Sequence, residues 1–370
     1  MAYKMPENKK FRIILIASII FIVLLVLILG LVLGLKKDKD NDIPADDVEI
    51  VNSYDNTEEL MKKFPLQNNI TVQDGLEKRI QNRLLTGFEN WNRGYKAWKK
   101  WGNILYTNAS IYNVNGARLT LGQYQQAMDV TLKQVNIQLG DFHNMVICGE
   151  YTGIFYDDAH IRDGVRENGT VMEFVRFKEY GEGLGTRVVV GWGGTKGDSY
   201  NNLIKFQGDH EKMVQDEINN LLMNYQVPTT GTLREKYPIL YPVEYLETEK
   251  ANKFIDIIME GFDKWNTGID EYINWLTKGY TSDAKSYGLN GEERNMKTYG
   301  DAMKALVSEK KIIKLYFDNI LVRDNWAAIH YRYRSIMVES GEKDVGDRMQ
   351  FLKFKEEENN SYKIEATWIQ

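Results

Sequence analysis

The chain has 370 residues, of which 43% are apolar, 27% charged and 12% aromatic, with a formal net charge of -5. This balance is typical of globular domains and lacks the basic surface that nucleic-acid binding needs, so we expect no nucleic-acid partner. The single cysteine, Cys148, excludes an intrachain disulfide and a cysteine-rich zinc site. The glycine-rich segments at Gly181 and Gly191 and the acidic loop 156–170 lack the spacing of nucleotide or calcium sites. We therefore expect no cofactor and no metal.

An uncharged apolar segment occupies residues 13–35, after a short basic N-terminus over 1–12. As a helix, this segment spans about 34 Å at roughly 1.5 Å per residue, which is enough to cross a bilayer. The alternative, a cleaved signal peptide, usually has a shorter apolar core and a small-residue cleavage motif, and no such motif precedes Lys36. We expect an uncleaved transmembrane helix at 13–35 that binds the protein to a membrane.

Basic residues lie on both sides of this segment, so the positive-inside rule favours a cytoplasmic N-terminus only weakly. Possible N-glycosylation sequons occur at Asn69, Asn108, Asn168 and Asn359. They are compatible with a C-terminal part outside the cytoplasm. We expect a single-pass protein with residues 1–12 as a cytoplasmic tail and its C-terminal domains extracellular or lumenal. Residues 36–70 are polar and typical of a solvated stalk.

The rest of the chain is a tandem duplication. The sequence GFENWNRGYKAWKKW at 87–101 returns as GFDKWNTGIDEYINW at 261–275. After a one-residue shift the match aligns Tyr112 with Tyr287, and it continues to MEFVRFKE at 172–179 against MQFLKFKE at 349–356. The repeated unit is longer than a solenoid repeat of about 20 to 50 residues, so each copy should be a whole domain. We expect a first domain over 71–225, a linker over 226–245 that contains three of the six prolines, and a second domain over 246–370.

The same elements follow in each copy. Apolar residues at helical spacing over 76–91 and 254–265 predict a long first helix, and two shorter helices follow it. Beyond about Val135 and Ile312 the apolar period changes to two, with glycine- and aspartate-rich turns, as in antiparallel strands. The prediction is an α+β protein of two tandem cone-shaped units, each with about three N-terminal helices packed on a curved antiparallel sheet.

This order of elements resembles a known family. A helix that ends in W-N-x-G, a short helix followed by Y-T, a loop with N-G, a helix with Y-x-x-A-M and a bent antiparallel sheet are similar to the nuclear transport factor 2-like superfamily, in particular its SnoaL-like branch. The resemblance covers about 76–192 and 251–370. It implies a pocket between helices and sheet, used in the family for small apolar ligands, for isomerase, cyclase or dehydratase chemistry, or for pairing with proteins. It also implies an intrachain pairing of the two copies through their sheets.

Related enzymes that move a proton next to a carbonyl use an Asp or His base on the sheet and Tyr or protonated Asp donors. His143 and Glu150 are weak candidates for this base. We expect both in one strand, on opposite faces because their separation is odd, so only one can line a pocket. His330 is expected in the equivalent strand of the second copy, on a face with Arg332 and Arg334. None of the four histidines aligns with another across the copies, so the copies share no acid/base pair.

What the copies share is aromatic. Most shared aromatic residues are expected in the core, and a few in the walls of the pockets. The pocket candidates are Trp91, Trp101, Tyr106, Tyr112 and Tyr124 in the first copy, and Trp265, Trp275, Tyr280, Tyr287, Tyr299 and His330 in the second.

Shared aromatic residues without shared acid/base residues favour a membrane-anchored, non-catalytic module. We expect it to bind a small apolar ligand or a protein partner outside the cytoplasm. The alternative is a SnoaL-like isomerase, cyclase or dehydratase with a single active copy, in which Glu150 or His143 is the base. A first-copy pocket with one of these residues beside a tyrosine hydroxyl would favour the enzyme. Two cones filled by Trp and Phe side chains would leave a scaffold.

Overall fold

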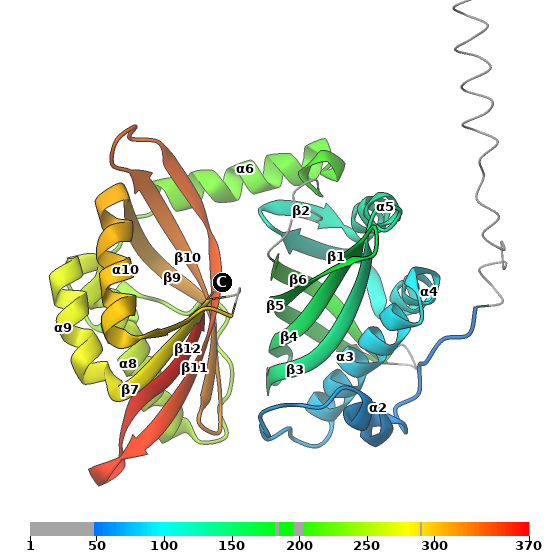
Figure 1. The fold of residues 1–370 in the computed structure, drawn as a ribbon, viewed down its shortest axis with the longest axis horizontal. Helices are drawn as coiled ribbons and strands as arrows, with labels where there is room; N and C mark the ends of the chain where they lie inside the picture. The colour runs from blue at the N-terminus through cyan, green and yellow to red at the C-terminus, as the bar shows by residue number, and fades with distance from the viewer. Residues whose placement is uncertain (1–47, 182–184, 196–202, 289–290, 370) are drawn as a thin grey trace, which may run out of the picture. The chain divides into compact units, whose positions relative to one another are not determined.

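The computed structural model describes residues 48–369, apart from 182–184, 196–202 and 289–290 (Figure 1). The expected transmembrane helix at 13–35 lies outside the described residues. Within the described part of the chain, no helix is both long and apolar enough to span a membrane. Residues Glu49–Gln370 form one compact unit.

Two six-stranded sheets with the same strand order form the framework, as the duplication predicts. The first sheet runs β2-β1-β6-β5-β4-β3 and the second β8-β7-β12-β11-β10-β9. Neighbouring strands are antiparallel except that β1 lies parallel to β6 and β7 parallel to β12. The strands of the first sheet are β1 Tyr106–Val114, β2 Ala117–Thr120, β3 Asn136–Cys148, β4 Tyr151–Arg162, β5 Val165–Tyr180 and β6 Gly185–Thr195. Those of the second are β7 Tyr280–Gly288, β8 Glu293–Asn295, β9 Lys310–Arg323, β10 Trp326–Met337, β11 Lys343–Glu357 and β12 Ser361–Ile369.

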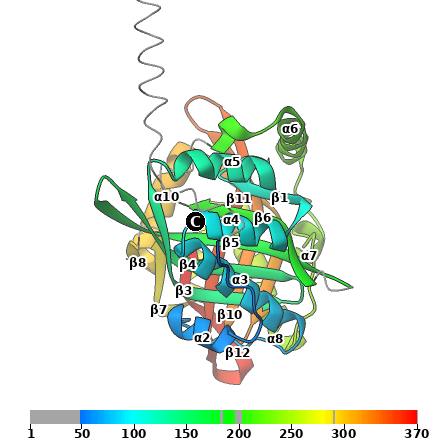
Figure 2. The same ribbon diagram turned by 90° about the vertical axis from the view of Figure 1, so that its right-hand side faces the viewer.

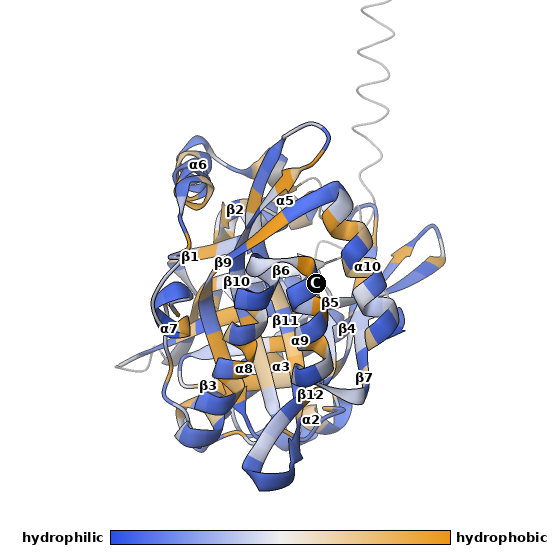
Figure 3. Ribbon diagram, turned by 90° about the vertical axis from the view of Figure 1, so that its left-hand side faces the viewer, coloured by the Kyte–Doolittle hydropathy of each residue, from blue (hydrophilic) through white to orange (hydrophobic). Residues whose placement is uncertain are grey.

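Helices cover one face of each sheet, so the α+β prediction is confirmed (Figures 1 and 2). The first copy has α2 Thr57–Lys63, α3 Leu76–Asn92, α4 Tyr95–Leu105, α5 Leu121–Thr131 and the short helix η2 Leu203–Phe206. Helix α6 Asp209–Asn224 follows it. The second copy has α7 Leu233–Lys236, α8 Thr248–Thr267, α9 Ile269–Gly279, α10 Met296–Glu309 and η3 Glu358–Asn360. In Figure 3 the helices of the second copy turn mainly hydrophilic residues to the viewer, with hydrophobic segments beneath them.

The repeated G-F…W motif has a packing reason. A Cβ atom on Gly87 in α3 would lie 2.7 Å from the Trp101 ring in α4, and one on Gly261 would lie 2.5 Å from the Trp275 ring. Glycine within a helix costs about 1 kcal/mol relative to alanine. Here it allows each tryptophan ring to lie directly against the long helix in both copies.

Residues 49–70 differ from the solvated stalk expected over 36–70. Helix α2 and the segment after it bury Leu60, Phe64 and Ile70, which are 5%, 3% and 4% exposed. Leu66 forms a parallel bridge to Phe142 in β3. Few apolar residues occur here and they follow no regular period, so the composition gave the wrong prediction for this stretch.

The expected linker, 226–245, makes the equivalent contacts in the second copy. Tyr237 is 1% exposed, and Ile239 forms a parallel bridge to Phe317 in β9. Phe64-Pro65-Leu66 and Tyr237-Pro238-Ile239 are therefore repeats of one another, and each copy begins before its long helix. The linker region is part of the second copy rather than a free connection.

The faces of the two sheets that carry no helices contact each other (Figure 1). The apolar cluster between them contains Ile70, Val146, Cys148, Phe155, Met172 and Phe174 from the first copy and Leu321, Trp326, Ala328, Met349 and Phe351 from the second. At its edge the guanidinium of Arg323 pairs with Glu77, with 2.6 Å between Nη2 and Oε1, and donates to the carbonyl of Ile147 at 2.7 Å. Both charged side chains are almost fully buried, so this contact between the copies excludes water.

Candidate functional site

The space between the helices and the curved sheet of each copy is called its cone below. The first cone encloses a cavity of about 100 Å³. Its walls are Arg83, Leu84, Gly87, Phe88, Trp91, Trp98, Trp101, Leu105, Tyr106, Tyr112, Tyr124, Leu139, Ile154, Tyr156, Glu173, Val175, Phe177, Val188 and Gly191. An adjoining cavity of about 30 Å³ shares Tyr112, Tyr124, Glu173 and Gly191 with it. The lining is mainly aromatic and aliphatic, as in sites for small apolar ligands.

Among the described residues that line the cavity, Glu173 alone carries a carboxylate. It lies on β5 opposite Ile154, while its neighbours Met172 and Phe174 lie in the apolar cluster on the other face of the sheet. The hydroxyl of Tyr156 donates to Glu173 Oε1 at 2.7 Å. Burial raises the pKa of Glu173 to about 7, against the hydrogen bond from Tyr156, which lowers it. At neutral pH both the charged and the neutral form of this carboxyl are therefore populated.

Two tyrosine hydroxyls lie near this carboxyl. Tyr106 and Tyr112 are hydrogen-bonded to each other, and the Tyr112 ring stacks on the Tyr124 ring with 4.4 Å between centroids. Burial raises the pKa of Tyr106 and of Tyr112, and the charge of Glu173 adds to both shifts. Both hydroxyls stay protonated at neutral pH and can donate hydrogen bonds.

Gly191 on β6 provides the room for this arrangement. It is the parallel neighbour of Tyr112 on β1, and a Cβ atom at Gly191 would lie 3.3 Å from the Tyr112 ring. A side chain there would press on the ring that forms one wall of both cavities. The absence of a Cβ is therefore part of what keeps the first cone open.

The structure brings together all five pocket candidates of the first copy, Trp91, Trp101, Tyr106, Tyr112 and Tyr124. It places the two base candidates elsewhere. His143 on β3 stacks on Phe155, which lies on the face of the same sheet that is turned away from the cone. Its Nε2 lies 2.6 Å from an Asp157 carboxylate oxygen. Glu150 was expected in the same strand, but it lies in the turn between β3 and β4 and pairs with Arg176 at 3.1 Å. Neither residue lines the cavity of the first cone.

In the second copy, Trp265, Trp275, Tyr280 and Tyr299 pack in the core of the cone. His330 does not face the cone: it is fully buried, with its ring 5.3 Å from the rings of Phe174 and Trp192 of the first copy. Its Nε2 lies 2.6 Å from an Asp347 carboxylate oxygen. This histidine belongs to the contact between the sheets.

The strand register changes one alignment made from the sequence. Tyr112 pairs with Gly191 on β6, whereas Ser286 pairs with Thr367 at the equivalent point of β12. Tyr112 therefore corresponds to Ser286, and the expected match with Tyr287 is wrong by one residue. Because side chains alternate between faces, a slip of one residue moves Tyr287 to the other face. There its ring stacks on Trp368, with 5.2 Å between centroids.

The sequence comparison missed Glu173. The signal was present in the repeated segment MEFVRFKE and MQFLKFKE, in which Glu173 corresponds to Gln350. Residues that both copies retain do not include it, because the carboxylate is present in one copy alone. Gln350 is buried, and its amide donates to the Thr367 hydroxyl at 2.6 Å.

Two more cone positions differ between the copies. Thr367 occupies the place of Gly191, as the strand register shows. Lys314 occupies the place of Leu139. The equivalent residues Asn92 and Asn266 show this, because their side-chain amides donate at 2.7 Å to the carbonyls of Leu139 and Lys314 respectively. The second cone thus holds larger or charged side chains where the first has a glycine and a leucine.

The four sequon asparagines, Asn69, Asn108, Asn168 and Asn359, are all exposed. Each side chain is therefore accessible to a glycosylating enzyme, provided that this part of the chain lies in the lumen.

No protein-family model matches the sequence, and no curated protein matches it either. Solved structures similar to one third of the chain include AclR, a candidate hydroxylase from Streptomyces galilaeus, with 12% identity, 33% of this chain and 89% of that chain covered, and a TM-score of 0.28. A candidate polyketide cyclase from Xanthomonas campestris has 10% identity, coverage of 32% and 90%, and a TM-score of 0.26. A ketosteroid isomerase-like protein from Erwinia carotovora atroseptica has 9% identity, coverage of 34% and 96%, and a TM-score of 0.26. At these values we base no functional conclusion on the likeness.

Proposed function

We propose that the first copy is an acid/base enzyme that moves a proton next to the carbonyl of a small apolar compound. The observation that carries this proposal is the Glu173 carboxyl in the aromatic cavity, 2.7 Å from the Tyr156 hydroxyl and with a pKa raised to about 7 by burial. A general base works best when its pKa is close to the pH at which it operates. The proposal corresponds to the alternative of a single active copy, with Glu173 as its base instead of Glu150 or His143.

In the proposed reaction, the Glu173 carboxylate removes a proton from the carbon next to the carbonyl. The electron pair of the broken C–H bond moves to the carbonyl oxygen, and the hydrogen-bonded hydroxyls of Tyr106 and Tyr112 stabilise the charge that develops there. Protonated Glu173 then returns the proton to the same or to a conjugated carbon, which gives exchange or isomerisation. Tyr156 holds the carboxyl in place through its hydrogen bond to Oε1.

The cavity limits the size of the substrate. Its volume of about 100 Å³ is smaller than the engineered cavity of about 150 Å³ that binds benzene in another protein. A short-chain ketone therefore fits without rearrangement of the walls, whereas a compound with a single small ring is at the upper limit and fits only if the walls move slightly. The apolar lining favours a substrate whose only polar group is the carbonyl.

We propose that the second copy does not catalyse this reaction. The amide of Gln350 cannot accept the proton, and Ser286 lacks the ring and the acidic hydroxyl of Tyr112. The apolar cluster between the sheets and the buried pair of Arg323 and Glu77 support a role for the second copy as a fixed partner of the first.

We also propose that residues 13–35 anchor the protein in a membrane, with the N-terminus in the cytoplasm and both copies extracellular or lumenal. The apolar segment and the four exposed sequons support this topology. Protease added to intact cells should then digest the two copies if they are extracellular, and protease added to sealed microsomes should spare them if they are lumenal. Protection in intact cells together with digestion in sealed microsomes would contradict the orientation.

The enzyme can be tested by deuterium exchange from heavy water into small cyclic ketones, such as cyclopentanone, followed by nuclear magnetic resonance. The full chain should accelerate exchange next to the carbonyl, and Glu173→Gln should lower the rate by about 10²- to 10⁴-fold. Glu150→Gln is the matched control, because it makes the same chemical change at a surface carboxylate, and it should leave the rate unchanged. Equal rates for the wild type and Glu173→Gln would refute the proposal. If the ketone still binds in that case, the first copy is a binding module.

A further inference from the structure

The second cone is built around Lys314. The Nζ atom lies 4.2 Å from the ring centroid of Phe262, 5.1 Å from that of Trp265, 5.6 Å from Tyr272 and 5.7 Å from Tyr331. These rings come from α8, α9 and β10, so three elements enclose one amine. In the first copy the equivalent position is Leu139, which lines the proposed catalytic cavity.

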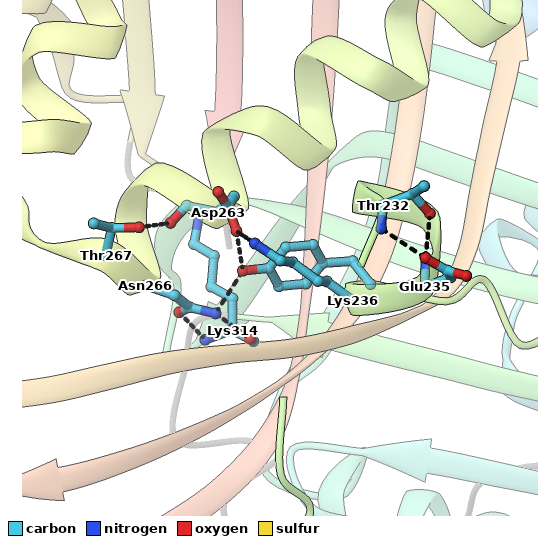
Figure 4. A network of polar contacts seen from close by, with 8 residues as sticks. Thr232, Glu235, Lys236, Asp263, Asn266, Thr267 and Lys314 are labelled. Carbon is cyan, nitrogen blue, oxygen red and sulfur yellow. Dashed lines mark hydrogen bonds and ion pairs between the residues drawn. The ribbon is translucent and has the colours of Figure 1, made fainter. Parts of the chain in front are cut away.

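No carboxylate of the described residues lies within ion-pair distance of this amine. The nearest acidic side chain in Figure 4, Asp263, is engaged elsewhere: its Oδ1 lies 3.0 Å from Lys236 Nζ and accepts from the Tyr237 hydroxyl at 3.4 Å. The charged group that acts on this amine is the guanidinium of Arg348 on β11, which repels a protonated amine. Lys314 is thus enclosed by aromatic rings and like charge, without an anion to hold its proton.

Two opposing effects act on its protonation. The faces of the aromatic rings attract an ammonium ion, whereas burial and the Arg348 charge favour the neutral amine. Burial is the larger cause, with Arg348 second, and together they lower the pKa of Lys314 to about 7. A lysine desolvated in an apolar pocket beside a second cation is an activated nucleophile. Lys314 is partly exposed.

We propose that Lys314 is a nucleophilic amine that captures small apolar aldehydes and ketones, so that the second cone is a carbonyl-binding site. The Nζ lone pair forms a bond to the carbonyl carbon, and the carbonyl oxygen takes up a proton to give a carbinolamine. Loss of water, which carries away that oxygen, gives an imine. Imine formation needs no oxidant or reductant, and hydrolysis of the imine reverses the reaction. The Tyr272 and Tyr299 hydroxyls, 3.3 Å apart, can relay the protons.

The site is independent of the acid/base function proposed for the first copy, since it uses none of its residues. Arg348 on β11 is the charged group that lowers the pKa of the amine. Tyr272 on α9 and Tyr331 on β10 present their rings to it, and Asp263 on α8 is paired with Lys236 on α7. The pH dependence of its reaction reports on this whole set.

The experiment is reductive alkylation of the full chain with propanal and cyanoborohydride at pH 7, with each lysine mapped by peptide mass spectrometry. At pH 7 half of an amine with a pKa of about 7 is neutral, against roughly one in 2,500 for a pKa near 10.4. Allowing for restricted access, we expect Lys314 to react at least about tenfold faster than Lys310 and Lys311 on the same strand. Its rate should level off above pH 7.

Lys314→Arg should remove the fast reaction, and Lys285→Met, a change at an exposed lysine paired with Glu293, should leave it intact. Glu173→Gln should also leave it intact, which separates this site from the first cone. If Lys314 in the wild-type protein reacts no faster than Lys310 and Lys311, the proposal is overturned, and this result needs no variant to fold.

Discussion

The two cones agree at the positions that join helix to sheet and differ at the positions that face the interior. In both, a tryptophan of the long helix donates its indole N–H to the first long strand: Trp91 to the Ile137 carbonyl at 2.8 Å and Trp265 to the Ile312 carbonyl at 2.9 Å. Inside, the first cone has a carboxyl group, Glu173, and the second an amine, Lys314. The duplication has thus preserved a frame around two different kinds of chemistry.

The comparison shows where function is found in a duplicated fold. Residues that both copies retain hold the structure together, so they predict the fold well and the reaction poorly. The exchanges of Glu173 for Gln350 and of Gly191 for Thr367 remove a base and fill space in the second cone. A difference between copies is therefore more informative about a site than a shared residue.

Removal of the shared tryptophan contacts between helix and sheet should have the largest effect on stability, and the effect should be similar in each copy. Trp91→Ala and Trp265→Ala each delete a buried indole and its hydrogen bond, so each should lower the free energy of unfolding by about 3 to 5 kcal/mol. Denaturant unfolding followed by circular dichroism measures both. A cost in one copy several times that in the other would show that the frames are not equivalent.

A change that gives the first cone a residue of the second should have a smaller effect on stability and a clear effect on ligand binding. Gly191→Thr places a side chain against the Tyr112 ring, where a Cβ atom already lies at 3.3 Å. We expect a loss of about 1 to 3 kcal/mol in stability from overpacking. Cyclopentanone binding to the first cone, followed by ligand-detected resonance, should also be lost. The reverse change, Thr367→Gly, is the control, and it should leave binding in the first cone unaltered.

The two interiors should also differ in their response to pH, with the smallest effects on stability. Burial raises the pKa of Glu173 from 4.5 to about 7, so the wild type should lose stability relative to Glu173→Gln as the pH rises from about 4.5 to about 7. The full shift corresponds to about 3 kcal/mol, and partial exposure reduces the expected difference to about 1 to 2 kcal/mol. Thermal unfolding of both proteins across this pH range measures the difference.

Lys314→Leu should show the opposite dependence. The pKa of Lys314 falls from 10.5 to about 7 on folding, so the wild type loses stability relative to the variant as the pH falls from about 10.5 to about 7. The advantage of the variant should be about 1 kcal/mol below pH 7 and vanish above pH 10.5, after discount for partial exposure and for the attraction of the rings. An advantage that grows with pH would contradict the environment described for this amine.

Periodicity predicted most of the fold. The helices around Phe88 and Phe262 and the strands after Val135 and Ile312 have clear periods of 3.6 and 2, and the structure has them there. The segment around Phe64 has neither period, because its few apolar residues bury in a turn-rich path against β3. Its contribution to the core depends on long-range contacts that local sequence patterns do not record.

The site was predicted in part. The aromatic walls, such as Trp91 and Tyr124, followed from the repeat, whereas the base did not. The choice of Glu150 and His143 assumed a single regular strand, but β3 ends at Cys148 and Glu150 lies in the turn. Glu173 belongs to a segment with an ordinary alternating pattern, and only the three-dimensional register reveals that it faces the cavity.

Titration of Glu173 tests the central claim most directly. Carbon-13 resonance of labelled glutamate carboxyls, with Glu173→Gln for assignment, measures the pKa of this group in the full chain. We predict a pKa of about 7 for Glu173, because burial in the aromatic cavity disfavours its charge. Glu150, half-buried and paired with Arg176 outside the cavity, serves as a comparison carboxyl in the same copy. A pKa for Glu173 near 4.5 would show a solvated carboxylate, and the first cone would then lack the base on which the proposed reaction depends.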